Sequence, residues 1–174
     1  MARIRAFKGV RPKAELAKAV CAPPYDVINS DEARKMAEGN PQSFLYVDKP
    51  EIALPRETDL YSPEVYAAGR TALERLMAEG VLVQDERPML YVYQQEWRGA
   101  VQTGLVACVA VDDYDEDLVK KHEKTRKDKE DDRARHVDVT GANAGLVFLT
   151  YKASAEIDGI ISRVIEKKPV YDFV

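Results

Sequence analysis

The chain has 174 residues, a net charge of −4 and 45% hydrophobic residues, which are values of a globular domain and not of a disordered chain. The acidic balance disfavours a nucleic-acid partner, because a sequence-independent grip on DNA or RNA needs an excess of cations facing phosphates. No apolar run approaches the ~20 residues that cross a bilayer, and no signal peptide follows Met1. With only two cysteines, Cys21 and Cys108, and neither in a C-x-x-C motif, the sequence predicts a cytoplasmic protein without a membrane partner.

The first half of the chain predicts short elements separated by prolines. A short strand is expected at Ile4–Lys8, and the composition of Lys13–Val20 allows two helical turns. Ser30, followed by two acids, marks a helix start, and Ser43–Asp48 has the composition of a strand. A long helix is predicted to begin after Ser62-Pro63 and to end near Gly80, because apolar residues recur at helical spacing at Val65, Ala68, Ala72, Leu73, Leu76 and Met77.

The second half predicts a β-hairpin followed by further strands and a helix. Met89–Trp97 and Val101–Val111 are rich in Val and aromatic residues, and a turn signal at Arg98-Gly99 separates them. Leu105–Val111 is apolar on both faces, which favours a central strand, and Gly145–Tyr151 is another candidate strand. A helix is expected over the apolar stripe of Ile157, Ile160, Ile161, Val164 and Ile165. The predicted fold is a single α+β domain over residues 1–174, with a mixed, mainly antiparallel sheet and flanking helices.

One segment concentrates the charge and both histidines of the protein, from His122 to His136. We consider three interpretations of this segment. In the first it is a solvated helix with charge pairs, each worth about 0.2–0.5 kcal/mol. In the second it holds an anion, because Arg offers a forked pair of donors to phosphate, Lys a point charge and Thr a hydroxyl. The residues predicted to bind phosphate or a nucleotide are Thr125, Arg126, Lys129, Arg133 and His136.

The same segment supplies a candidate acid/base group. Either Glu123 or His122 is expected to accept a proton near neutral pH. Thr125 or Asp128 is a candidate cap for a helix starting near Lys129, and a helix N-terminus attracts anions. A third interpretation is a metal site, but the spacing of the histidines and Glu123 matches no standard ligand pattern, so we predict no metal.

A proline-rich loop forms a second candidate site. The consecutive prolines before Tyr25 exclude a helix interior, because they remove donors and fix φ. A plain structural turn explains the loop, and so does a rigid loop that presents its side chains at a pocket. The residues of this candidate pocket loop are Pro24, Tyr25 and Asp26.

A series of motifs resembles a known family. In chain order these are Phe7-Lys8-Gly9-Val10-Arg11-Pro12, Ala22-Pro23-Pro24-Tyr25-Asp26-Val27-Ile28, Asn40-Pro41-Gln42-Ser43-Phe44-Leu45, Gln102-Thr103-Gly104-Leu105, His122-Glu123-Lys124-Thr125-Arg126 and Lys129-Glu130-Asp131-Asp132-Arg133. The chain resembles, over nearly its whole length, the N-terminal half of the prokaryotic domain-of-unknown-function family number 1015.

The resemblance implies a relationship to the ParB and sulfiredoxin superfamily, which includes nucleotide-dependent enzymes, among them a free-serine kinase. Members of the family are longer than this chain, and their later half carries an Asp-Gly-His-His-Arg signature that this chain lacks. The resemblance therefore implies either an N-terminal domain of a longer protein whose C-terminal half is missing here, or a degenerate copy of the family.

Two functions follow from these observations. In the first, the domain contributes a phosphate site to a nucleotide-dependent, kinase-like phosphotransferase, with ADP, ATP or CTP and Mg²⁺ as the expected cofactors and a nucleotide or small phosphorylated molecule as the ligand. In the second, it is a noncatalytic binding or assembly module, and its charged segment docks the missing half or another subunit of a homo-oligomer.

Overall fold

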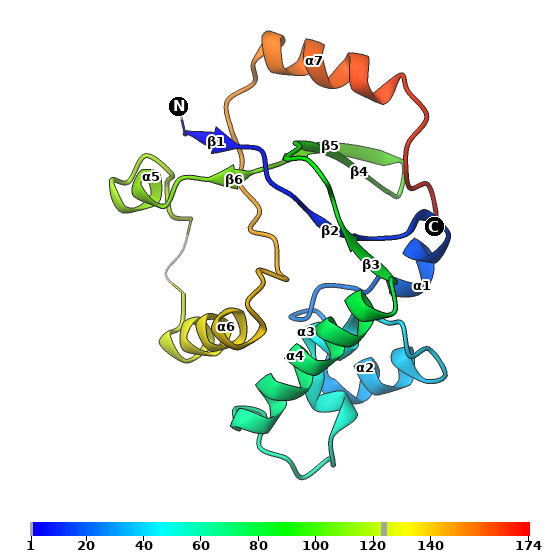
Figure 1. Cartoon of the computed structure of the whole chain (residues 1–174). Coiled ribbons are helices and arrows are strands. Elements are labelled where there is room, and N and C mark those ends of the chain that lie inside the picture. Colours follow the sequence, from blue (N-terminus) through cyan, green and yellow to red (C-terminus); the bar gives the residue numbers. More distant parts are fainter. Residues whose placement is uncertain (1, 123–124) are drawn as a thin grey trace. The chain divides into compact units, whose positions relative to one another are not determined.

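The computed structural model describes residues 2–122 and 125–174, and the chain divides into two compact units (Figure 1). Unit 1 is built from the stretches 1–11, 84–124 and 149–172, and unit 2 from 12–83, 125–148 and 173–174. Helices and short antiparallel strand pairs occur in separate runs along the chain, which confirms the predicted α+β class. Every helix in the described part of the chain is too short or too polar to cross a bilayer.

Unit 1 is organised around a β-hairpin. Strands β4 (Tyr91–Trp97) and β5 (Ala100–Val106) pair antiparallel along their whole length through the expected Arg98-Gly99 turn. A second antiparallel pair joins β1 (Ile4–Arg5) to β6 (Cys108–Val109). The unit also contains helices α5 (Val111–Asp115) and α7 (Ala155–Ile165), and α7 lies against β4.

Unit 2 is mainly helical. Strands β2 (Val10–Pro12) and β3 (Leu82–Gln84) are hydrogen-bonded neighbours, and the boundary between the units falls within both. Two short 3-10 helices cover Ala14–Leu16 and Pro50–Ala53. The α-helices are α1 (Ala17–Val20), α2 (Ser30–Ala37), α3 (Leu45–Asp48), α4 (Pro63–Ala78) and α6 (Lys127–Thr140).

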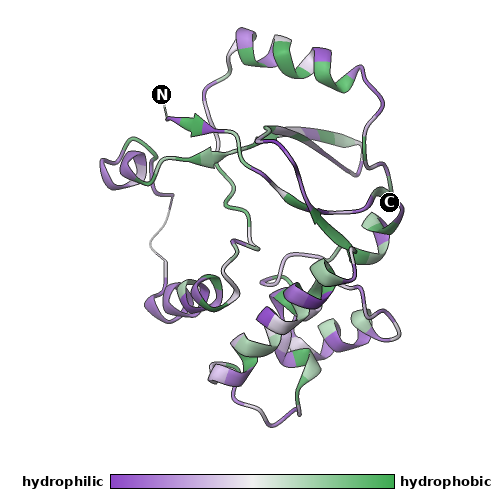
Figure 2. Cartoon of the chain, viewed as in Figure 1, coloured by the Kyte–Doolittle hydropathy of each residue, from purple (hydrophilic) through white to green (hydrophobic). Residues whose placement is uncertain are grey.

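The hydrophobic core of unit 2 consists of two clusters around α3 and α4. The first contains Val20, Val47, Ala72, Leu73, Leu76, Val81 and Leu82. The second contains Ala33, Ala37, Leu45 and Ile52. Helix α6 packs against α4, although most of its surface is hydrophilic (Figure 2). The apolar burial that stabilises this unit thus comes from the segment before residue 83, and α6 adds charge to its surface.

The strand predicted at Ser43–Asp48 is wrong, because the chain forms α3 there. The amide of Asp48 donates to the carbonyl of Phe44, and that of Lys49 to the carbonyl of Leu45. These bonds satisfy the backbone within the segment, and buried neighbours surround both sides of it. Strand propensity reflects the fit to a half-buried pleated surface, which this position does not offer.

Two other strand predictions are also corrected. Leu105–Val111 is not a central strand, because among the described residues β5 has only β4 as a neighbour, and Cys108 is exposed. Gly145–Tyr151 forms no strand, and the side chain of Phe148 is 72% exposed. The cap of α2 is Asn29 and not Ser30, because the Asn29 side chain accepts from the amides of the first turn in a capping box.

Candidate functional site

The charged segment forms helix α6, but its start differs from the prediction. Arg126 is the N-cap, and neither Thr125 nor Asp128 caps the helix. The first turn contains Asp128 and Glu130, whose negative charges lie at the positive end of the helix dipole. The positive end of the helix dipole is therefore occupied by carboxylates of the same chain. The N-terminus of α6 does not by itself support an anion site.

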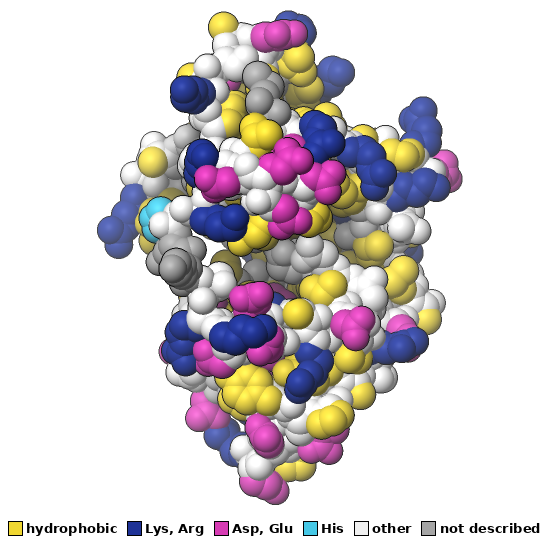
Figure 3. Space-filling model, turned by 90° about the vertical axis from the view of Figure 1, so that its left-hand side faces the viewer, with side chains coloured by type: hydrophobic (Ala, Val, Ile, Leu, Met, Phe, Trp, Pro, Cys, Tyr) yellow, Lys and Arg dark blue, Asp and Glu magenta, His cyan; other side chains and the backbone are white. Residues whose placement is uncertain are grey.

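The cations of the first turn point into solvent and pair with nearby carboxylates. Arg126 forms a 2.7 Å ion pair with Asp128, and its side chain is 75% exposed. Lys127 pairs with Asp131 one turn later. On the face shown in Figure 3, basic and acidic side chains are interspersed. This part of α6 matches the interpretation of a solvated helix with charge pairs.

Two more residues of the predicted phosphate set lie at this exposed end. Lys129 donates a 3.1 Å hydrogen bond to the hydroxyl of Tyr61, which raises the pKa of Lys129. The hydroxyl of Thr125 donates to a carboxylate oxygen of Glu130 at 3.4 Å. Both side chains therefore contact groups of unit 2 rather than each other.

Arg133 is held more firmly than the cations that precede it. Its side chain is 30% exposed, and its Nε and Nη2 atoms donate to Oδ2 of Asp132 at 3.2 and 3.1 Å. The guanidinium carbon lies 4.3 Å from the centre of the Tyr25 ring. The structure thus joins the pocket loop and the charged segment, which the sequence presented as separate candidates.

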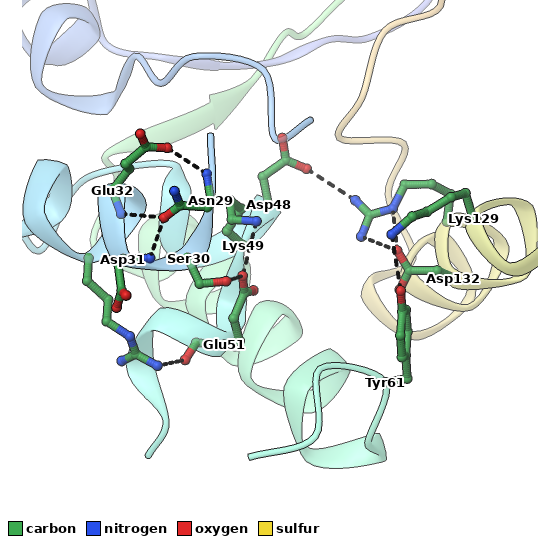
Figure 4. A network of polar contacts seen from close by, with 12 residues as sticks. Asn29, Ser30, Asp31, Glu32, Asp48, Lys49, Glu51, Tyr61, Lys129 and Asp132 are labelled. Carbon is green, nitrogen blue, oxygen red and sulfur yellow. Dashed lines mark hydrogen bonds and ion pairs between the residues drawn. The ribbon is translucent and has the colours of Figure 1, made fainter. Parts of the chain in front are cut away.

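A carboxylate that the sequence did not single out faces Arg133. Asp48, the last residue of α3, has a side chain that is 11% exposed, and its Oδ1 atom lies 3.8 Å from Nη1 of Arg133 (Figure 4). That oxygen is buried and accepts no hydrogen bond within the described residues. Burial raises the pKa of Asp48, against the lowering effect of the Arg133 charge. A buried polar atom without a partner is rare and requires an explanation.

The two histidines lie in different environments. His136 is 2% exposed, and its Nε2 atom is 2.8 Å from the carbonyl oxygen of Val47, so the ring links α6 to α3. His122 is exposed and belongs to unit 1. The other candidate base, Glu123, lies outside the described residues.

A buried tyrosine positions the carboxylate that pairs with Arg133. The hydroxyl of Tyr66, on α4, donates a 2.8 Å hydrogen bond to Oδ1 of Asp132. Burial and this hydrogen bond raise the pKa of Tyr66 to about 12. Asp132 therefore accepts from Tyr66 through one oxygen and from Arg133 through the other.

The pocket loop forms a turn in which the amide of Val27 donates to the carbonyl of Pro24 at 3.2 Å. Tyr25 is half-buried beneath Arg133, whereas Pro24 and Asp26 are exposed. The charge of Asp26 contributes to the raised pKa of Asp48. Of the three predicted loop residues, Tyr25 makes the direct contact with the Arg133 site.

A second polar network lies beside the site, at the start of α2. Oε1 of Glu51 accepts a 2.7 Å hydrogen bond from Ser30 and forms a 3.1 Å ion pair with Lys49 (Figure 4). The adjoining depression has a volume of about 500 Å³, and its wall includes Asp31 paired with Arg56. These charges already have partners, so we place the candidate site at Arg133.

Comparison with known proteins identifies a family for this chain. No curated protein and no solved structure shows significant similarity to this chain. A family model described as "Protein of unknown function (DUF1015)" matches residues 4–174. The match covers nearly the whole chain and includes both segments that meet at Arg133, the pocket loop and α6. The chain therefore belongs to the DUF1015 family.

Proposed function

We propose that unit 2 binds a phosphate-bearing ligand, a nucleotide, at Arg133, and contributes this site to a nucleotide-dependent phosphotransferase of the kinase type. One observation carries the proposal. Arg133 is stacked on Tyr25 and fixed by Asp132, while its Nη1 group donates no hydrogen bond within the described residues. A positioned guanidinium with a free edge is the side chain that suits a phosphate oxygen.

The stacking makes this arginine suitable for binding. Its planar guanidinium already packs on an aromatic face. Ligand binding therefore costs less side-chain entropy than it would if an exposed arginine had to be ordered. Arg126, by contrast, is 75% exposed and has no aromatic partner in the described structure. The relationship to the ParB and sulfiredoxin superfamily, which the family resemblance implies, supports a nucleotide as the ligand class.

The carboxylates around Arg133 favour a nucleotide bound with a cation. Asp132 pairs with Arg133, Asp48 faces it, and the charge of Asp26 acts on Asp48. These negative charges repel a bare phosphate, and a Mg²⁺ ion arriving with the nucleotide reduces that repulsion. The described residues include no ready-made cluster of three metal ligands, so the ion enters with the phosphates in this proposal.

Calorimetric titration of the whole chain with ATP, ADP and CTP tests the proposal, with Mg²⁺ and with EDTA. We expect one of the three to bind with Mg²⁺, and its affinity to fall about tenfold or more in Arg133→Gln, since a charged hydrogen bond is worth roughly 1.5–3 kcal/mol. Arg70→Gln is the matched control, because Arg70 forms an exposed pair with Glu74 on α4. Absence of binding by all three nucleotides at millimolar concentration overturns the proposal.

A second function is favoured by the exposed end of α6. Its cations and carboxylates alternate in sign, which suits a complementary protein surface better than a single anion. In this alternative the charged segment docks a protein partner, such as another copy of the chain. Gel filtration of wild type and of the double reversal Lys127→Glu with Asp131→Lys tests it; an unchanged elution volume across a hundredfold range of concentration counts against self-association.

A further inference from the structure

We infer that Asp48 is the proton acceptor of this site and that its Oδ1 atom takes the proton from a substrate hydroxyl as the phosphoryl group is transferred. The inference deepens the proposed function and rests on it. Asp48 belongs to neither sequence segment that was singled out for the site, and its role follows from its position against Arg133.

Within the described part of the chain, the facing atoms of the two side chains leave a donor and an acceptor unused, although Oδ1 of Asp48 is buried. Oδ1 of Asp48 and Nη1 of Arg133 are 3.8 Å apart, which is too far for a direct hydrogen bond. An oxygen placed between them can lie at about 2.8 Å from each, accepting from Arg133 and donating to Asp48. A hydroxyl group has both functions, whereas a fully ionised phosphate oxygen can only accept.

The surroundings of Asp48 make it a better base than an ordinary carboxylate. Burial disfavours its charged form and raises its pKa, and the charge of Asp26 acts in the same direction. The charges of Arg133 and His136 on α6, and of Lys49 at the end of α3, act in the opposite direction without cancelling the rise. A carboxylate whose pKa is raised towards neutral pH accepts a proton more effectively in general base catalysis.

The other candidate bases fit this site less well. His136 has its Nε2 atom 2.8 Å from a backbone carbonyl and is almost fully buried. His122 is exposed, whereas Oδ1 of Asp48 is buried next to Arg133. Among the described residues, Oδ1 of Asp48 is the buried side-chain oxygen without a hydrogen-bond partner, so it can accept a proton from a ligand.

The proposed step balances as a phosphoryl transfer. The substrate hydroxyl oxygen forms a bond to the terminal phosphorus of the nucleoside triphosphate. The bond from that phosphorus to the bridging oxygen breaks, and the nucleoside diphosphate leaves with the electron pair. The hydroxyl proton passes to Oδ1 of Asp48, which later releases it to solvent. The Nη1 group carries two N–H donors, so one can bind the substrate hydroxyl oxygen while the other binds an oxygen of the transferred group.

Proton counting during nucleotide binding tests the inference without a known acceptor. Mg–ATP is titrated calorimetrically at pH 6 in two buffers of different ionisation enthalpy. An anionic ligand beside Asp48 favours its protonated form, so we expect the wild-type chain to take up a fraction of a proton that Asp48→Asn does not take up. Asp131→Asn, an exposed change on α6, is the control and keeps the wild-type proton count.

Slow hydrolysis of Mg–ATP, with water as the acceptor, supplies a second readout. We expect Asp48→Asn to retain Mg–ATP affinity within about threefold and to lose roughly 100-fold in hydrolysis rate, the loss typical of a general base. Equal proton uptake in wild type and Asp48→Asn overturns the inference, whatever the hydrolysis rate. If the wild-type chain binds none of the nucleotides, the proposed function fails. If Arg133→Gln changes binding and proton uptake while Asp48→Asn changes neither, the proposed function stands and only the role of Asp48 fails.

Discussion

The hydroxyl of Tyr66 donates a 2.8 Å hydrogen bond to Oδ1 of Asp132, and this contact joins α4 to α6. Through it, a core helix determines where the partner of Arg133 lies. Together with the hydrogen bonds from Arg133, the bond fixes the orientation of the Asp132 carboxylate. The contribution of this hydrogen bond can be measured as a change in the free energy of unfolding.

Tyr66→Phe is expected to destabilise the chain by about 1.5–3 kcal/mol, the range for a hydrogen bond to a charged group. The phenyl ring still fills the same buried space, so the loss reports the hydroxyl and not packing. Urea denaturation at pH 7 measures it. A change below about 0.5 kcal/mol would show that Asp132 finds another donor in solution.

The same bond predicts an alkaline dependence. The pKa of Tyr66 is raised to about 12 in the folded chain, against an ordinary value of 10. The stability it contributes is therefore complete below pH 10 and is lost as the pH rises towards 12. The difference in unfolding free energy between wild type and Tyr66→Phe should shrink across that window; a constant difference would contradict the assignment.

Asp48→Asn is expected to stabilise the folded chain at pH 7. Burial raises the pKa of Asp48, so its charged form is disfavoured by folding, and this group stabilises the fold at acid pH and less as the pH rises. A neutral amide of the same shape avoids that cost, with a gain of roughly 0.5–2 kcal/mol, as is common for stabilising changes at functional sites. Thermal melts from pH 4 to 7 test it: the gain should grow with pH.

Asp85→Asn is expected to destabilise unit 1. Arg11 donates to both carboxylate oxygens of Asp85, at 2.8 and 2.5 Å, and this pairing lowers the pKa of Asp85. The contribution is present above the ordinary aspartate pKa and disappears as the pH falls through the folded value. We expect a loss of about 1.5–3 kcal/mol at pH 7.

The matched control for this pair is Asp128→Asn. Its partner Arg126 is 75% exposed, and exposed ion pairs contribute about 0–1 kcal/mol. Urea denaturation of both variants at pH 7 and pH 3 compares them. Equal losses at pH 7 would mean that the Arg11 pair is as well solvated as the surface pair.

Gly9→Ala is expected to strain unit 1. A Cβ atom at Gly9 would lie 2.6 Å from the hydroxyl oxygen of Tyr91, whose position is fixed by hydrogen bonds to Gly9 and Asp85. Overpacking of this kind costs about 1–3 kcal/mol. Combining it with Tyr91→Phe removes the colliding oxygen, so the double variant should lose less than the sum of the single changes. Strict additivity in urea denaturation would show that the clash is relieved in another way.

Local sequence patterns correctly predicted the elements whose conformation depends mainly on the residues within them. The spacing after Pro63 predicted α4, the stripe around Ile161 predicted α7, and Arg98-Gly99 predicted the hairpin turn. Ser43–Asp48 was assigned wrongly because its strand-like composition reflects burial among helices. In that segment, neighbours distant in sequence override local preference.

In the candidate site too, local patterns identified individual residues but not the contacts between residues distant in sequence. Arg133 and Tyr25 were named from charge and prolines, but only the fold shows that they are in contact. Asp48 was missed because an aspartate at the end of an apolar segment resembles any surface residue in sequence. Its burial depends on the packing of α6 over α3, a contact that no local pattern encodes. The predicted assignment of a catalytic role to Glu123 or His122 stays a prediction.

Each unit is assembled from three separate stretches of chain. A ribosome therefore releases the apolar core of unit 2 long before α6, which supplies Arg133 and His136, and unit 1 stays incomplete until the stretch after residue 148 has emerged. Such late, long-range closure slows folding. Fragments cut at the ends of helices would separate partners that lie far apart in the sequence, so a fragment that ends before α6 is expected to lack Arg133 and its contact with Tyr25.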